Sequence, residues 1–180
     1  MKTLTDDLRY PIGPFRFDGD FGSARRNQWM DELAAAPEHL HKAVAGLGAG
    51  QLDTPYRDGG WTVRQVAHHL PDSHLNAYTR MKLALTEEEP TIKPYEEARW
   101  AELPDARSGD IEVSLALLDS LHRRWLLLLR QLTGAEFARS FRHPEHGRSM
   151  SLGEALALYA WHGRHHVAHI TSLRHRMGWD

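Results

Sequence analysis

The residues of this sequence that could do chemistry are histidines at helical spacing. The segment Trp161-His-Gly-Arg-His-His-Val-Ala-His169 contains two pairs four positions apart, His162 with His166 and His165 with His169. Side chains at that spacing lie on one face of a helix, so each pair could bind one metal ion. A catalytic zinc ion usually has three protein ligands and an open position, so a third ligand must come from elsewhere in the chain.

The apolar residues of the same segment indicate which pair faces the protein interior. At about 100° per residue, His166 falls within the arc of the apolar side chains and His162 lies next to it. His169 lies farther from that arc and His165 farthest of all. We therefore expect His162 and His166 to face inward and His165 to be peripheral. The arc is formed by Leu152, Ala155, Tyr159, Ile170, Leu173 and Met177.

The third ligand has four candidates: His68, His69, His74 and His122. A buried histidine is often a hydrogen-bonded core residue, and for His122 we favour that interpretation. Two inward-facing histidines one turn apart are harder to explain by packing, because each buried imidazole needs a polar partner. Asp72 follows His69 by three positions and could either orient a ligand or be exposed. The remaining histidines are expected on the surface or in turns: His39, His41, His143, His146 and His175.

The composition indicates one domain, residues 1–180, and excludes several kinds of site. The chain has 13 histidines and no cysteine, so disulfides, thiolate metal sites and a cysteine nucleophile are excluded. A formal charge of −2 argues against a strongly basic nucleic-acid-binding surface. The longest apolar run, 155–161, is too short to cross a membrane, and the first residues lack the apolar core of a signal peptide. We expect a cytoplasmic protein that acts on a small molecule.

Four segments have the apolar periodicity of long helices, and none indicates a strand. We therefore expect an all-α fold, an up-down four-helix bundle. Residues 87–109, rich in proline and charged residues, should form a long surface connection that helps to line the substrate pocket. The long helices are expected at about 23–47, 62–86, 108 or 110 to 132, and 151–177.

Local signals refine these helices. Thr62-Val-Arg-Gln65 and Ser151-Leu-Gly-Glu154 fit capping boxes, in which two side chains reciprocally satisfy free backbone amides. Pro37 and Pro71 lie inside the first and second helices, and each lacks the N–H that the preceding turn requires. At Pro37 we expect a kink or a fresh helix start, and at Pro71 a kink within two residues of His69.

Several motifs resemble those of the DinB-like four-helix metalloproteins. Trp61-Thr-Val-Arg-Gln-Val-Ala-His-His-Leu70 resembles their Trp-x7-His-Leu start, and the His162-x3-His166 pair resembles their terminal motif. Tyr10-Pro-Ile-Gly13, residues 51–60 and the final Arg-Met-Gly-Trp179 are similar to the YfiT subgroup of metal-dependent hydrolases, which includes bacillithiol S-transferases. The resemblance extends over nearly the whole chain.

The resemblance implies a metal site between helices two and four, formed by His69, His162 and His166. These include the pair that the apolar arc selects. It also implies zinc or nickel as the ion, a cytoplasmic setting and a homodimer. Pro71 departs from the family pattern, which usually has a helix-forming residue such as alanine at this position. The departure concerns the helix geometry beside His69 rather than the identity of the ligand.

Three functions are compatible with such a site. A metal ion with an open position could bind a low-molecular-weight thiol, lower its pKa and deliver it to an electrophile. The same position could instead activate water for hydrolysis. Alternatively, the ion could only join helix two to helix four, as a structural module without catalysis. The lack of cysteine suits the first function, because a thiol must then come from a cosubstrate.

Overall fold

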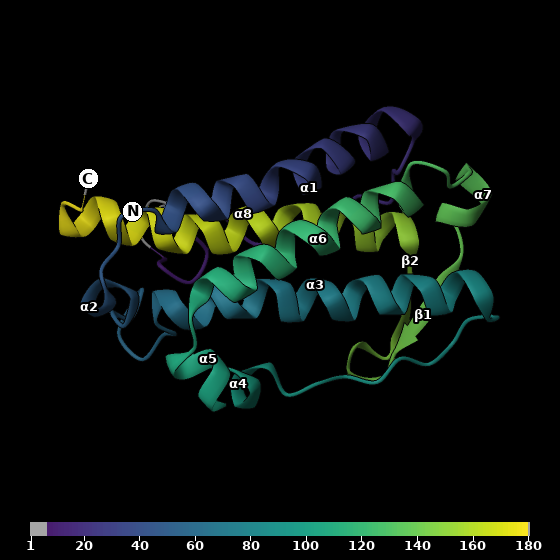
Figure 1. Ribbon diagram of the computed structural model, residues 1–180. Coiled ribbons are helices and arrows are strands. Elements are labelled where there is room, and N and C mark those ends of the chain that lie inside the picture. Colours follow the sequence, from purple (N-terminus) through teal and green to yellow (C-terminus); the bar gives the residue numbers. More distant parts are fainter. Residues whose placement is uncertain (1–6, 180) are drawn as a thin grey trace.

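The structure is a computed structural model that describes residues 7–179, and helices dominate it (Figure 1). Four of the helices are long: α1 (Ser23–Val44), α3 (Val63–Thr86), α6 (Ile111–Leu129) and α8 (Leu152–Met177). The shorter elements are α2 (Ala49–Leu52), α4 (Glu97–Trp100), α5 (Pro104–Ser108), α7 (Gly134–Phe137), the strands β1 (Ser140–His143) and β2 (Arg148–Ser151), and the 3-10 helix η1 (Pro144–His146). The predicted four-helix bundle is confirmed.

In the bundle, α1 lies diagonally opposite α3, and α6 lies diagonally opposite α8. Helix α8 contacts both α1 and α3, and α6 contacts the same two helices from the other side. Two hydrophobic clusters fill the bundle, one around Trp125 and Leu156 and the other around Leu70 and Ile170. On α8 the histidines occupy the interval between the two clusters, where the apolar stripe is interrupted. Among the described residues, no helix is both long and apolar enough to cross a membrane.

Two neighbouring long helices, α3 and α6, run in the same direction, so the expected up-down order of the helices is wrong. Along α3 and α6, His68 contacts Ser114, His74 contacts His122 and Met81 contacts Trp125. From the end of α3, the chain must pass back along the bundle to reach the start of α6. Residues 87–110, which include α4 and α5, form this return connection (Figure 1). The long connection predicted from composition is therefore what makes α3 and α6 parallel.

A two-stranded antiparallel hairpin precedes α8, although the sequence indicated no strand. Phe141 pairs with Met150, and both side chains are buried against the bundle. Each strand has four residues, too few for an alternating pattern to be recognised in the sequence. Packing against the helices, rather than local periodicity, stabilises this hairpin.

The helix starts and prolines differ in part from expectation. The capping box of Thr62 and Gln65 is confirmed, with both hydrogen bonds present. At the start of α8, Ser151 accepts from the amide of Glu154, but the Glu154 carboxylate binds Arg148 instead of closing the box. Helices α1 and α3 continue through Pro37 and Pro71, so no fresh helix starts at Pro37, and the expected kinks stay predictions.

Candidate metal centre

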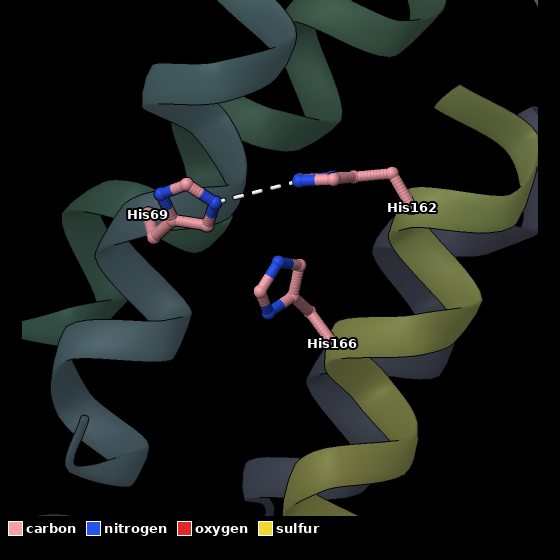
Figure 2. A group of neighbouring side chains, drawn as sticks. All are labelled: His69, His162 and His166. Carbon is pink, nitrogen blue, oxygen red and sulfur yellow. Dashed lines mark hydrogen bonds between the residues drawn. The ribbon is translucent and has the colours of Figure 1, made fainter. Parts of the chain in front are cut away.

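The three histidines of the predicted site lie together between α3 and α8 (Figure 2). His69 comes from α3, and His162 and His166 come from successive turns of α8. One ring nitrogen of each residue lies within 4.8 Å of the others, and the Nε2 atoms of His69 and His162 are 3.4 Å apart. Two ligands of a tetrahedral zinc ion are about 3.3 Å apart when each bond is about 2.0–2.1 Å. The separation of His69 and His162 therefore suits two ligands of one divalent ion, and His166 lies close enough to be considered as the third.

The surroundings of the cluster favour neutral imidazoles, which are the form that binds metal. His69 and His166 are buried, and His162 is partly buried. Burial lowers the pKa of His69 to about 4, with a smaller contribution from the neighbouring histidines. Burial likewise holds the pKa values of His162 and His166 well below the usual range. Trp61 packs on the ring of His69 at a centroid distance of 4.6 Å.

A second group on α8 consists of His165, His166 and His169, whose ring nitrogens also lie within 4.8 Å of one another. It shares His166 with the first group and draws all its members from one helix. The Nε2 atom of His169 lies 3.1 Å from the carbonyl oxygen of Arg9, so one of its nitrogens is already used. The first group alone joins two helices.

The expectation that His165 is peripheral is wrong. Its side chain is buried because Trp161 stacks on it at 4.3 Å and Tyr10 packs at 5.8 Å. The segment that contains Tyr10 crosses α8, and the carbonyl of Gly13 accepts a hydrogen bond from the Trp161 indole. A helical wheel contains no information about such a covering segment.

Two other candidates for the third ligand lie behind the cluster. Nε2 of His74 is 3.1 Å from Nδ1 of His162, and Nδ1 of His74 is 2.8 Å from Nε2 of His122. Nδ1 of His122 lies 2.7 Å from the carbonyl oxygen of Leu33. His122 is therefore a hydrogen-bonded core residue, as expected, but one connected to the cluster. The sequence signal for this connection was its position on the apolar seam of α6.

His68 and His143 have different surroundings from the cluster. Nδ1 of His68 lies 2.7 Å from the Ser114 hydroxyl, so this histidine joins α3 to α6. His143 was expected on the surface or in a turn, and that expectation is wrong. It is buried at the end of β1 because it shares a face of the strand with Phe141, and it lines the cavity beside the cluster.

The cluster opens into a cavity of about 630 Å³. The 87–109 connection contributes Tyr95 and Glu97 to its wall, as the sequence analysis predicted. The charged side chains of the wall are of both signs, three arginines and two glutamates: Arg9, Arg57, Arg80, Glu97 and Glu145. A cavity of this size can hold a small molecule with its reacting atom at the histidines.

The carboxyl group of Asp72 should make the stability of the fold depend on pH. Its carboxylate is partly buried and, among residues 7–179, makes no hydrogen bond to a histidine of the cluster. Burial, with the charge of Asp105, raises the pKa of Asp72 to about 6. The folded state therefore binds a proton more tightly than the unfolded state, and the carboxylate destabilises the fold progressively as pH rises from about 4 to 6.

Asp72→Asn removes this cost. We expect no gain in stability at pH 4 and a gain of about 1 kcal/mol at pH 7.5, a value discounted because water reaches part of the carboxyl group. Urea unfolding of the metal-free protein at both pH values measures it, with Asp58→Asn as the control at an exposed carboxylate. An equal gain at the two pH values would contradict this explanation.

Comparison with known proteins places the chain in a family. Residues 32–170 match the model of the DinB superfamily. A Bacillus mycoides protein named "putative metal-dependent hydrolase" is 55% identical over 96% of this chain and 99% of its own length. A protein of the same name from Oceanobacillus iheyensis is 54% identical over 95% of this chain and 98% of its own length.

A solved structure agrees with this assignment. YfiT from Bacillus subtilis, described as "a probable metal-dependent hydrolase with an unusual four-helix bundle topology", has a TM-score of 0.94 and 51% identity. The match covers 96% of this chain and 99% of the YfiT chain. The family model, the curated relatives and the fold therefore agree: the chain belongs to the DinB superfamily.

Proposed function

We propose that His69, His162 and His166 bind a divalent metal ion, zinc in the first instance and nickel as the alternative, and that the protein is an enzyme. The observation that carries the proposal is a cluster of three imidazole nitrogens beside a cavity of about 630 Å³. Among the described residues, no fourth histidine, aspartate or glutamate completes this group. A site with three protein ligands keeps a position for substrate, which favours catalysis over a purely structural ion.

The reaction we propose is transfer of a low-molecular-weight thiol, bacillithiol-like, to an electrophilic carbon. A bound ion would supply Lewis acidity, which lowers the pKa of a thiol at its open position. The sulfur then forms a bond to carbon, the leaving group departs with its electron pair, and the thiol proton passes to solvent. The chain itself has no cysteine, so the sulfur must come from a cosubstrate.

The residues of the cavity would bind and orient these partners. Arg9 and Arg57 lie near the end of the cavity that Tyr56 and His169 line, and they could pair with anionic groups of a thiol cosubstrate. Trp61 covers one side of His69, so it would limit the approach of water from that side. The homodimer and the cytoplasmic setting that the family resemblance implies stay predictions.

Hydrolysis is the second candidate, because the relatives are named as metal-dependent hydrolases. In that case water would occupy the open position in place of the thiol. The cavity would then hold the bond to be cleaved, and its arginines would bind an anionic substrate.

A paired assay distinguishes the two reactions. The zinc-loaded protein is incubated with monochlorobimane and, in turn, bacillithiol, cysteine and coenzyme A, and the fluorescent thioether is measured. A matched sample is incubated with a panel of ester and amide substrates. We expect thioether formation above the uncatalysed rate with at least one thiol, abolished by a chelator and restored by zinc.

The outcomes separate the hypotheses. Metal-dependent hydrolysis without thiol consumption would overturn S-transfer and support the second candidate. Binding of one zinc ion without activity in either assay would favour the structural module. A protein that binds no zinc or nickel would refute the proposed site.

A further inference from the structure

We infer that His74 and His122 are positioning residues that hold His162 in the tautomer whose Nε2 lone pair faces His69 and His166. The inference rests on the proposed metal site and adds a role for two histidines outside it. It starts from a chain of three imidazoles that begins at a backbone carbonyl and ends at the cluster.

The first link of the chain exists because of Pro37. In α1 the carbonyl of Leu33 would accept the amide of residue 37, but proline has no N–H to donate. A buried carbonyl needs another donor, and Nδ1 of His122 lies 2.7 Å from the Leu33 oxygen. A carbonyl can only accept, so Nδ1 of His122 must carry the proton.

The remaining protons follow in sequence because a neutral imidazole has one donor and one acceptor nitrogen. Nε2 of His122 is then an acceptor, so Nδ1 of His74, at 2.8 Å, must donate to it. Nε2 of His74 is in turn an acceptor, so Nδ1 of His162, at 3.1 Å, must donate to it. This leaves Nε2 of His162 unprotonated, 3.4 Å from Nε2 of His69.

Packing holds the hydrogen-bonded imidazoles in place and excludes water from them. His74 and His122 are buried and nearly parallel, with an angle of 14° between their rings. The ring of Trp125 lies at close to right angles to both imidazoles. Tyr159 packs against His74 and His162 from α8. Water therefore cannot easily replace a link, and the direction of the chain depends on the Leu33 carbonyl.

The consequence is that Nε2 of His162 is unprotonated, and so able to bind a metal ion, before any ion is bound. Metal-binding histidines commonly donate their second N–H to a protein acceptor, and loss of that acceptor weakens metal affinity by about 10–100-fold. Without the acceptor at position 122, an Nδ1–H of His74 would have no hydrogen-bond partner. The tautomer of His74 with its proton on Nε2 is then favoured. His162 must then protonate its own Nε2, the atom that faces the proposed ion.

The direct test is the tautomer of each histidine in the metal-free wild-type protein. Long-range proton–nitrogen NMR of uniformly nitrogen-15-labelled protein near pH 7.5 distinguishes Nδ1–H from Nε2–H. We expect Nδ1–H for His122, His74 and His162. An Nε2–H tautomer at any one of the three would overturn the inference, whether or not the protein binds metal.

A matched pair of variants tests the effect on metal binding. His122→Gln places its amide oxygen near the position of the lost Nε2 and can still accept from His74, whereas His122→Leu has a similar volume and no acceptor. Zinc dissociation constants are measured by competition with a chromophoric chelator, after circular dichroism has verified the fold. We expect His122→Leu to weaken zinc binding by about 10–100-fold and His122→Gln to stay within about threefold of wild type.

The results separate this inference from the proposed function. If the wild-type protein binds zinc and the two variants bind it equally well, the role of His122 is refuted while the metal site stands. If the wild-type protein binds no zinc, the proposed function fails, and the tautomers still test the hydrogen-bond chain by themselves. If His122→Leu does not fold, the wild-type tautomers decide.

Discussion

Replacement of His166 by alanine is expected to reduce the zinc content of the purified protein from one ion per chain to almost none. The variant retains His69 and His162, but two imidazoles do not make a stable zinc site in competition with a chelator. Loss of an acceptor behind a ligand already costs about 10–100-fold in affinity, so loss of the ligand itself should cost more than 100-fold. Zinc is measured by elemental analysis after dialysis against a weak chelator.

The same helix provides the control for this experiment. His175 lies on α8, two turns beyond the cluster, and its side chain is exposed. His175→Ala should retain one zinc ion per chain at wild-type affinity. If His166→Ala retained zinc as well as His175→Ala does, the proposed ligands would be wrong. A further His165→Ala variant would then show whether the second histidine group on α8 holds the ion.

Replacement of Trp125 by alanine is expected to lower the free energy of unfolding by about 3–5 kcal/mol. The indole is fully buried in the larger hydrophobic cluster and donates its N–H to the sulfur of Met81 at 3.2 Å. Its removal leaves a cavity between α3 and α6 and removes the packing surface of His74. Urea unfolding of the metal-free protein measures the loss directly.

A residue on the opposite face of α6 serves as the control. Leu127 is 71% exposed, so Leu127→Ala should change the free energy of unfolding by no more than about 0.5 kcal/mol. A loss for Leu127→Ala as large as that for Trp125→Ala would mean that burial of the side chain does not explain the effect. A small loss for Trp125→Ala would mean that the core collapses onto the vacated space, and Trp125 would then not be a main support of the histidine chain.

Much of the proposed site could be predicted from sequence because its chemistry is local. A spacing of four residues on a helix brings His162 and His166 together whatever surrounds them. The apolar stripe of the same helix has a gap that the histidines fill, and this gap can be seen in the sequence. The motif around His69 then suggested the third residue through its resemblance to a known family.

The contacts between distant segments could not be predicted. His165 is buried by a segment more than a hundred residues earlier in the sequence, which no helical wheel includes. The hairpin before α8 is stabilised by packing of Phe141 and Met150 against the bundle rather than by its own periodicity. The parallel direction of α3 and α6 depends on how the long connection crosses the bundle.

The sequence by itself determined the helices, the bundle and the three residues proposed to bind metal, because each depends on spacing along one helix or on a linear motif. Tertiary structure decided how His162 is supported. Pro37 removes an amide in α1, and that loss acts on α8 only because α6 and α3 place His122 and His74 between the two helices. Hydrogen bonds between helices depend on donor–acceptor distances that are correct to within a few tenths of an ångström. Residue spacing along one chain does not specify such distances.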